Sequence, residues 1–368
     1  MLHNRLTIHP GPTGRSPTIV GTGLVALDVL QSISEQGDPE TSLGGSAGNV
    51  LAILGHLGWH CVPVAQLGAD AAADRIWHEF AALGADTRFL RKDSDSCTPV
   101  IFQLPGRGAS THEFSFYCPI CGRKRGYAPP GNVADFASLL SDVGAPDVFF
   151  FDRVTPWALE LAERYSKGRT IIVFEPSTIG CDEAAFAQAL KCVDVLKYAD
   201  DRISDMAQFE FDVDLEICTQ GSNGLKFRSN SVPGAWHHVE AFDVPFISDT
   251  AGAGDWCTSG FLYAMFGEMF ERGTISSISH ISESLRIGQA LAALNCMSRG
   301  ARGLAKQKTS AEIVSMARSM RSDTCAHLLS QTNRLEITLF QETHGALPLH
   351  GHLKPLHLSP LCCETFAT

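Results

Sequence analysis

The chain has 368 residues, 44% of them hydrophobic, and a formal net charge of −11. This length and apolar content suffice for a large buried core, built as one large α/β domain or two smaller ones. The acidic balance and the lack of a long Lys/Arg block argue against a nucleic-acid-binding surface, and no apolar run is long enough to span a membrane.

Residues 1–17 carry charges, histidines and prolines but no apolar core of a secretory signal, so they are predicted to form a loose leader. The 12 cysteines are scattered, and only Cys118/Cys121 and Cys362/Cys363 are close pairs. Without an export signal, mostly reduced thiols in the cytoplasm are the simpler interpretation.

Strands and helices are predicted to alternate along most of the chain. In chain order they are strand 18–21, helix 49–57, strand 62–65, helix 71–83, strand 148–151, helix 156–167, strand 170–174 and helix 183–192. The runs at 148–151 and 170–174 are continuously apolar, which is typical of strands buried on both faces of a parallel sheet. The alternation predicts an α/β fold with a mostly parallel sheet.

Two polar segments, about 30–43 and 97–127, break this rhythm. Their alternating stretches indicate antiparallel strands outside the main sheet, and hence a candidate lid. Residues 326–368 are rich in His, Leu, Pro and Thr with weak periodicity, and we interpret them as a C-terminal tail of uncertain structure. The main domain is therefore predicted to span 18–325.

The most informative segment is Asp249-Thr250-Ala251-Gly252-Ala253-Gly254-Asp255, which precedes a predicted helix. Free N–H groups at a helix start, with small residues that allow close approach, form an anion site. A carboxylate at such a site can accept a proton from an attacking hydroxyl while Gly252, Ala253 and Gly254 hold a phosphate. On these residues alone, a glycine turn with a capping aspartate explains the segment equally well.

This segment resembles the C-terminal signature of the PfkB, or ribokinase-like, carbohydrate kinases. Gly44-Gly45-Ser46-Ala47-Gly48-Asn49 is similar to the family's N-terminal glycine pair, and Ile19-Val20-Gly21 with Asp28 resembles its first strand and substrate-binding aspartate. Residues 193–197 and 219–224 fall where the family has later strands and nucleotide contacts. The resemblance covers about 18–320 and implies a three-layer α/β/α sandwich with a small β lid.

The resemblance also implies roles for individual residues. The expected substrate-binding residues are Asp28, Gly44, Gly45 and Asn49. Asp255 is the expected base, with Gly252, Ala253 and Gly254 as the anion hole. Nucleotide contacts are expected from Lys197, Thr219, Gly221, Gly224, Ala251 and Asn295. Asp249 and Thr250 are expected near a monovalent cation such as K⁺.

Two departures from the family pattern concern magnesium. Where the family often has Pro-Asn-x-x-Glu, this chain has Tyr198-Ala199-Asp200-Asp201-Arg202, whose acidic pair is the candidate replacement. At Phe174-Glu175-Pro176-Ser177 the family more often has Asp-Pro-Asn, so a serine stands where an amide is common. The way in which Mg²⁺ is held is therefore open.

Other motifs are weaker. Gly44-Gly45-Ser46-Ala47-Gly48 matches a hydrolase elbow, but the residues before it are too polar for the required strand. Gly21 and Gly23 mimic a dinucleotide fingerprint, but polar residues 32–39 replace the helix that should follow. Neither a serine hydrolase nor a dehydrogenase is favoured.

Cys118-Pro119-Ile120-Cys121-Gly122 resembles half of a zinc knuckle. A structural zinc in the lid would need further ligands such as His112, Cys97 or the tail cysteines, and the alternative is a lid hairpin whose thiols bind no metal. The basic turn 123–125 is either solvated or holds phosphate over the site. Arg153 either touches substrate or forms a salt bridge.

These observations together predict a cytoplasmic kinase that transfers the γ-phosphate of MgATP to a hydroxyl of a sugar or sugar-like molecule. No nucleic-acid or membrane partner is expected, and a homodimer could form through the lid. The alternative is a kinase-fold binding or regulatory protein with little turnover, which the unusual residues after Lys197 motivate. Fructose, ribose, a keto-deoxy sugar acid and a nucleoside all remain open as acceptors.

Overall fold

The computed structural model describes residues 15–30, 39–105, 112–127, 137–230, 232, 234–266 and 277–321. The predicted tail and all but the last three residues of the predicted leader lie outside the described residues. So do 31–38 and 106–111, which belong to the two predicted lid segments.

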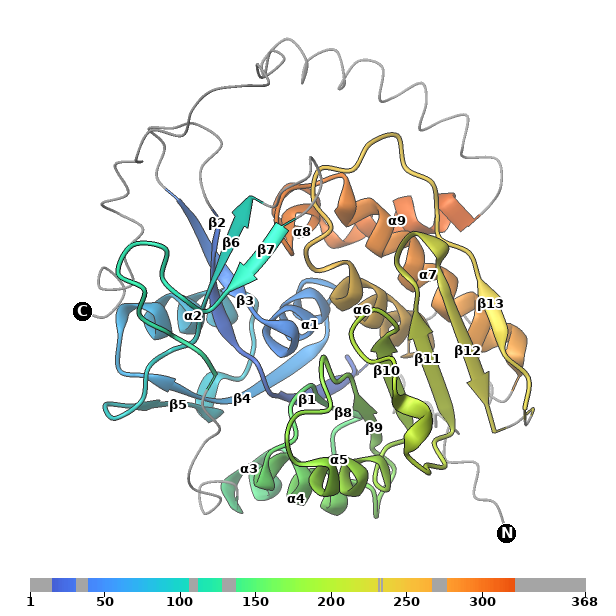
Figure 1. Ribbon diagram of the computed structural model, residues 1–368, viewed down its shortest axis with the longest axis horizontal. Coiled ribbons are helices and arrows are strands. Elements are labelled where there is room, and N and C mark those ends of the chain that lie inside the picture. Colours follow the sequence, from blue (N-terminus) through green and yellow to red (C-terminus); the bar gives the residue numbers. More distant parts are fainter. Residues whose placement is uncertain are drawn as a thin grey trace.

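A nine-stranded sheet forms the centre of the molecule, in the order β13-β12-β11-β10-β9-β8-β1-β4-β5 (Figure 1). Its strands are β1 (Thr18–Thr22), β4 (His60–Gly68), β5 (Leu90–Asp93), β8 (Val148–Phe151), β9 (Ile171–Phe174), β10 (Val195–Ala199), β11 (Leu215–Thr219), β12 (Leu225–Ser229) and β13 (His237–Val239). The sheet is parallel from β5 to β11, and β12 and β13 continue it antiparallel. The mostly parallel sheet expected from the sequence is confirmed.

Helices cover both faces of this sheet. The helices are α1 (Ser46–His56), α2 (Ala71–Ala82), α3 (Ala137–Asp142), α4 (Pro156–Tyr165), α5 (Glu183–Leu190), α6 (Ala253–Phe266), α7 (Ile278–Cys296), α8 (Gly303–Gln307) and α9 (Ser310–Arg321), with short 3₁₀ turns η1 (Thr87–Phe89), η3 (Met206–Gln208) and η4 (Gly221–Asn223). Successive side chains of a strand point to opposite faces, so Phe150 packs with α1, α6 and α7, whereas Phe149 and Phe151 pack with α4 and α5. The structure confirms the expected α/β/α layers.

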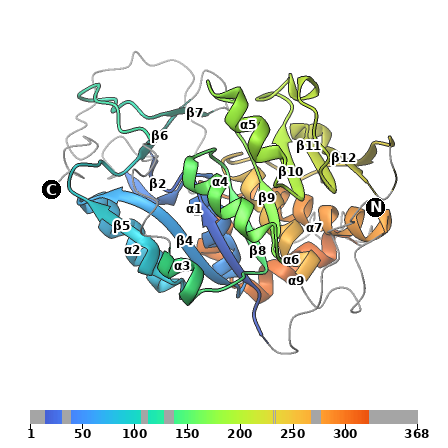
Figure 2. The same cartoon turned by 90° about the horizontal axis from the view of Figure 1, so that it is seen from below.

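A second, four-stranded sheet has the order β3-β2-β6-β7, with β2 (Ala26–Leu30), β3 (Glu40–Gly44), β6 (Val100–Pro105) and β7 (His112–Ser115). Its strands β6 and β7 stand apart from the main sheet (Figure 2). The first off-rhythm segment of the sequence contributes β3 and the last residue of β2, the second contributes β6 and β7, and β2 joins the two parts. One pairing differs from the antiparallel arrangement that we expected, because β2 and β6 run parallel. The chain passes through β4 and β5 of the main sheet between them, and this crossover lets β6 return in the direction of β2.

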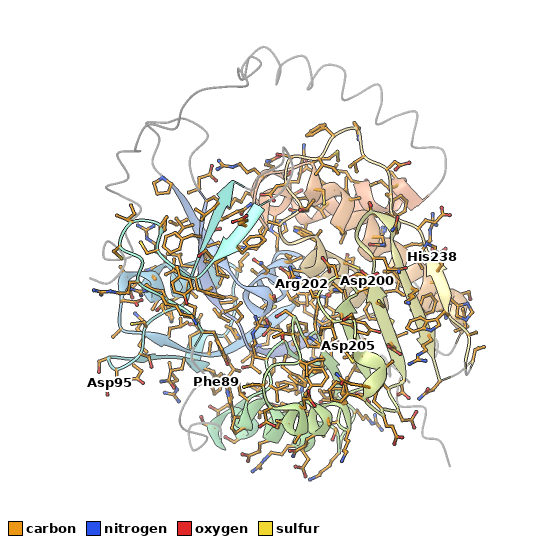
Figure 3. The ribbon with its side chains drawn as sticks, viewed as in Figure 1. Phe89, Asp95, Asp200, Arg202, Asp205 and His238 are labelled. Atoms are coloured by element: carbon orange, nitrogen blue, oxygen red, sulfur yellow. The ribbon has the colours of Figure 1, made fainter. Side chains whose placement is uncertain are left out.

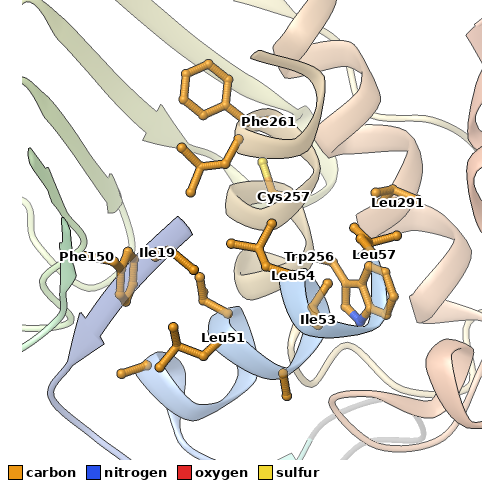
Figure 4. Close-up of a cluster of buried hydrophobic side chains, with 14 of the residues drawn as sticks. Ile19, Leu51, Ile53, Leu54, Leu57, Phe150, Trp256, Cys257, Phe261 and Leu291 are labelled. Carbon is orange, nitrogen blue, oxygen red and sulfur yellow. The ribbon is translucent and has the colours of Figure 1, made fainter. Parts of the chain in front are cut away.

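Helix α6, which carries Asp255, is fixed by an apolar interface with α1 and α7 (Figure 4). Trp256 is fully buried in the same cluster as Leu57 and Leu291, and its indole N–H donates to the Ala301 carbonyl at 3.0 Å. Gly260 and Gly288 allow α6 and α7 to approach closely, since a Cβ on Gly260 would lie 2.8 Å from the Gly288 Cα. The N-terminus of α6 is therefore held rigidly at the site described below.

Within the described part of the chain, none of the helices combines the length and apolarity that a membrane crossing requires.

Candidate active site

Four charged side chains meet at the carboxyl ends of the central strands. Asp152 directly follows β8, Glu175 directly follows β9, Lys197 lies in β10, and Asp255 lies in the first turn of α6. Parallel α/β sheets bind their ligands beyond the carboxyl ends of the strands. The charges influence one another, because Glu175, Lys197 and Asp152 all act on the Asp255 carboxyl.

The surroundings of Asp255 raise the pKa of its carboxyl, so that it binds a proton more readily than an exposed aspartate. Burial raises its pKa well above the ordinary value, and the neighbouring Glu175 charge raises it further. The hydrogen bond from Asn49 Nδ2 to Asp255 Oδ2, at 2.8 Å, and the charge of Lys197 act in the opposite direction. Asn49 lies in the first turn of α1, which begins three residues earlier than the sequence indicated, at Ser46.

The glycine turn leaves N–H groups without backbone partners next to this carboxyl. At the start of α6 the Ala253 N–H bonds the Thr250 carbonyl and the Trp256 N–H bonds the Gly252 carbonyl. Among the described residues, the N–H groups of Gly254 and Asp255 have no backbone acceptor. Such unpaired donors at a helix N-terminus form an anion site.

Glu175 and Thr258 belong to the site but were not among the predicted site residues. Lys197 Nζ donates to one Glu175 oxygen and, at 3.2 Å, to the Gly254 carbonyl, while Thr258 Oγ1 donates to the other Glu175 oxygen. Glu175 was named from the sequence only as part of the segment 174–177, in which the departure singled out was Ser177. The useful signal was its position: both it and Asp152 are carboxylates placed directly after an entirely apolar strand.

The residues expected to bind the acceptor lie together where β2, β3 and α1 meet. Burial raises the pKa of Asp28 to about 7, although Arg302 opposes this shift. Asp28 Oδ1 and Asn49 Oδ1 are buried and have no hydrogen-bond partner among the residues that the structure describes. Gly44 gives Asp28 its space, since a Cβ on Gly44 would lie 2.0 Å from the Asp28 Cγ, and Gly45 (φ 78°) has the left-handed conformation that starts α1.

The second sheet is bonded directly to the glycine turn through Asp249. This fully buried carboxylate accepts hydrogen bonds from the Gln103 side chain in β6 and from the N–H groups of Gly300 and Ala251, each at 2.8 Å. A monovalent cation at Asp249 and Thr250 would share the carboxylate with these three donors. The cation site stays a prediction.

A second connection to the second sheet runs from the loop after α7, which contains Gly300 and Arg302, to β3. Arg302 donates twice to the Leu43 carbonyl, at 2.6 and 3.1 Å, and once to Glu79, at 2.6 Å. Glu79 in turn accepts the Leu43 N–H at 2.8 Å. The peptide groups on either side of Leu43, which precede the glycine pair, are thus held between α2 and the loop after α7.

Asn295 is placed in the protein interior and braces the turn. Its Nδ2 donates to the Ala251 carbonyl at 3.1 Å and its Oδ1 accepts the Leu304 N–H at 3.2 Å. The other expected nucleotide residues, Thr219, Gly221 and Gly224, follow one another at the end of β11 and in η4. Their contact with a nucleotide stays a prediction.

The acidic residues after β10 do not form a preassembled metal cage. Asp200 and Asp201 are exposed, and Asp200 accepts a hydrogen bond from Gln220 at 3.2 Å; Figure 3 labels Asp200, Arg202 and Asp205 on this segment. Among the described residues, no three His, Cys, Asp or Glu side chains are grouped as a metal site would require.

The knuckle cysteines lie in the hairpin that follows β7. Cys118 is buried and Cys121 is exposed, and the Gly122 N–H bonds the Cys118 carbonyl at 2.9 Å. The tail cysteines that could complete a tetrahedron lie outside the described residues, as does the His112 side chain. A lid zinc stays a prediction.

Arg125 and Arg153, for which the sequence left two roles open, both form ion pairs with aspartates. Arg125 is buried and forms an ion pair with Asp70, which also accepts from Thr98 Oγ1 at 2.6 Å, so a solvated turn is wrong for this residue. Arg153 forms a salt bridge with Asp152 at 3.3 Å, the second of its two alternatives.

The architecture matches solved sugar and nucleoside kinases over most of its length. Fructokinase from Xylella fastidiosa with bound ATP gives a TM-score of 0.67 at 20% identity, covering 83% of this chain and 99% of that one. Aminoimidazole riboside kinase from Salmonella enterica gives 0.61 at 17% identity, covering 82% and 99%. A fructokinase from Vibrio cholerae with fructose, ADP and calcium gives 0.64 at 15% identity, covering 82% and 99%.

The chain has the ribokinase-like fold. No family model matches it. One curated relative, the bifunctional protein HldE of Mesorhizobium japonicum, is 34% identical over 93 residues, and the match spans 22% of this chain and only 19% of that protein. In the ribokinase-like fold described here, Asp255, the glycine turn and the acceptor-binding candidates all lie on one side of the main sheet, with Lys197 and Glu175 between the strands and α6.

Proposed function

We propose that the protein transfers the γ-phosphoryl group of ATP to a hydroxyl of a sugar or sugar-like molecule, with Asp255 as the base. One observation carries this proposal: the Asp255 carboxyl, whose pKa is raised well above its ordinary value, stands beside two N–H groups that have no backbone acceptor among the described residues. A proton acceptor and an anion site at the same helix start are the parts that phosphoryl transfer to an alcohol needs.

In the proposed reaction the acceptor hydroxyl gives its proton to the Asp255 carboxylate. The acceptor oxygen forms a bond to the γ-phosphorus while the bond from that phosphorus to the β–γ bridging oxygen breaks, and ADP leaves with the electron pair. The Gly254 and Asp255 N–H groups and the Lys197 ammonium offset the negative charge on the transferred group. Mg²⁺ would enter on the ATP phosphates and neutralise part of their charge.

The acceptor would bind where one carboxylate oxygen of Asp28 and the amide oxygen of Asn49 have no partner within the described part of the chain. Buried acceptors without partners are unfavourable, so hydroxyl groups of a polyol would complete these hydrogen bonds. Asn49 would then contact the acceptor through Oδ1 and Asp255 through Nδ2, which places an acceptor hydroxyl near the base.

The rival proposal is a kinase-fold binding or regulatory protein without efficient turnover. The exposure of Asp200 and Asp201 after β10, at the place where the family often has residues that organise magnesium, favours it. The presence of Asp255 beside the N–H groups of the glycine turn argues against it, because a proton acceptor next to an anion site is the arrangement that phosphoryl transfer to a hydroxyl needs.

ADP release measured over a panel of sugars and nucleosides decides between the two. Fructose, aminoimidazole riboside and inosine belong in the panel because kinases of similar structure were solved in complex with them. Asp255→Asn should lower kcat by about 10²-fold or more with little change in acceptor binding. Binding of ATP and an acceptor without turnover would support the rival, and a kcat of Asp255→Asn within a few-fold of wild type would remove Asp255 as the base.

A further inference from the structure

Four groups form a chain of hydrogen bonds that ends on the peptide before Asp255. A hydroxyl has one hydrogen, and the charged Glu175 oxygen is the stronger acceptor for the Thr258 proton than the Gly254 carbonyl 3.2 Å away. Lys197 then bonds the second Glu175 oxygen and the Gly254 carbonyl. The order is therefore Thr258 to Glu175, Lys197 to Glu175, and Lys197 to Gly254.

This chain of hydrogen bonds reinforces the direction that the first turn of α6 gives to an N–H group. The Gly254 carbonyl and the Asp255 N–H belong to one planar trans peptide, in which they point in opposite directions. When Lys197 holds the carbonyl on one side, the N–H must face the other side. That N–H and its neighbour on Gly254 are the two donors without backbone acceptors.

One of the three ammonium N–H groups of Lys197 has no acceptor among the described residues. An ammonium has three N–H groups, and among the described residues Lys197 uses two of them, for Glu175 and Gly254. The side chain is almost entirely buried, with 4% of its surface exposed, whereas Gly254 above it is exposed. A buried ammonium needs an anionic partner, and Glu175 supplies it.

We propose that Glu175 is a positioning residue for phosphoryl transfer: it holds Lys197 against the Gly254 carbonyl, so that the third ammonium N–H and the Gly254 and Asp255 N–H groups serve one phosphate. This inference rests on the proposed function. It gives Glu175 a role, because this carboxylate reaches both Lys197 and Thr258.

The charge of Glu175 also affects both ends of the pH profile. Burial lowers the pKa of Lys197, but Glu175, Cys257 and Asp255 raise it, and the net direction is upward. Burial raises the pKa of Asp255, Glu175 and Asp152 raise it further, and Asn49 and Lys197 lower it. Removal of the Glu175 charge therefore lowers both pKa values.

The decisive variant is Glu175→Gln, with Glu163→Gln as its control. Glu163 is an exposed carboxylate on α4 paired with Lys167, so the control removes the same charge at a distant ion pair. In Glu175→Gln we expect kcat to fall about 10- to 100-fold with an unchanged acceptor KM. Both limbs of the kcat–pH profile should move to lower pH, which a merely structural role would not cause. A profile that superimposes on wild type and on the control overturns the inference.

A second pair of variants keeps the test valid if Glu175→Gln does not fold. Thr258→Val removes one of the two groups that hold Glu175, and Thr258→Ser keeps the hydroxyl. The valine variant should lose several-fold in kcat and the serine variant should retain it. Equal rates in the two variants count against the inference.

Calorimetry with pyrophosphate separates this inference from the proposed function. Wild type and Glu163→Gln should bind pyrophosphate, and Glu175→Gln should bind it at least about 10-fold more weakly. If wild type turns over no acceptor but shows this binding difference, the kinase proposal fails and the positioning role stands. If wild type turns over and Glu175→Gln binds and reacts like it, or if wild type does not bind pyrophosphate, the positioning role is wrong.

Discussion

Asn49 Nδ2 and Asp255 Oδ2 are 2.8 Å apart, and this hydrogen bond joins the first turn of α1 to the first turn of α6. The bond stabilises the charged form of Asp255 against burial and against the charges of Glu175 and Asp152, while Lys197 assists it. The residue expected to hold the acceptor thus also affects the pKa of the proposed base.

Asn49→Ala should move the acidic limb of kcat/KM to higher pH, because loss of the amide donor raises the pKa of Asp255 further. This direction is opposite to that expected for Glu175→Gln. Asn230→Ala is the control, since Asn230 makes a similar 2.7 Å bond to Asp212 on the surface. An acidic limb at the wild-type position in Asn49→Ala would show that the bond does not control the base.

Asp28→Asn should raise the acceptor KM by about tenfold, with little effect on the KM for ATP, since a lost hydrogen bond at a buried group is equivalent to about 1–3 kcal/mol. The comparison of the two KM values locates the residue on the acceptor side. Equal changes for acceptor and ATP would contradict that location.

The same variant should be more stable than wild type at alkaline pH. The pKa of Asp28 is about 7 in the folded protein, against about 3.9 in an unfolded chain. The folded state therefore binds the proton more tightly, and the free energy of unfolding falls as pH rises between these two values. Chemical denaturation should show the largest gain for Asp28→Asn above pH 7 or so and none for exposed Asp95→Asn. A pH-independent difference would argue against a raised pKa.

Gly252→Ala should disturb the structure far more than Gly84→Ala, which replaces a glycine with a similar positive φ. Gly252 has φ 74° and a Cβ there would lie 2.4 Å from the Ala301 carbonyl oxygen, whereas Gly84 has φ 73° with open space around it. Gly84→Ala should lose only about 1 kcal/mol of stability. Gly252→Ala should lose more, and its turnover should drop about tenfold or more. Equal stability losses in denaturant titrations would show that the turn can move away.

Protein purified without a metal-affinity tag should contain about one zinc per chain, and Cys118→Ser should lose it, if the knuckle is completed by other ligands. Elemental analysis measures this directly, and Cys181→Ser, at another exposed cysteine, is the control. Metal-free protein in which both knuckle thiols react with a thiol reagent would end the zinc hypothesis.

The sequence was sufficient for the features that depend on local pattern. The all-apolar runs at β8 and β9 predicted buried parallel strands, and glycines within a turn before a helix predicted the N-terminus of α6. Both predictions use only the conformational preferences of neighbouring residues.

Features that depend on side-chain direction or on distant pairing could not be predicted. Asn295 lies in a long helix, and periodicity does not say that its amide turns inward to Ala251. Glu175 and Thr258 are 83 positions apart, and only the packing of α6 on the sheet brings them together. The parallel pairing of β2 with β6 likewise follows from a crossover that no local pattern specifies.

The second sheet has two bonds to the loops around the start of α6: Gln103 donates to Asp249 of the glycine turn, and Arg302, in the loop after α7, donates to the Leu43 carbonyl. Asp249 also accepts the Gly300 N–H, which joins these two loops. A displacement of β3 or β6 by a bound acceptor would therefore be passed to the turn that would hold the ATP phosphates. Thermodynamic linkage makes such an effect mutual: the factor by which acceptor changes the affinity for ATP must equal the factor by which ATP changes the affinity for acceptor. The two substrates would then recruit each other, and neither alone would assemble the complete site.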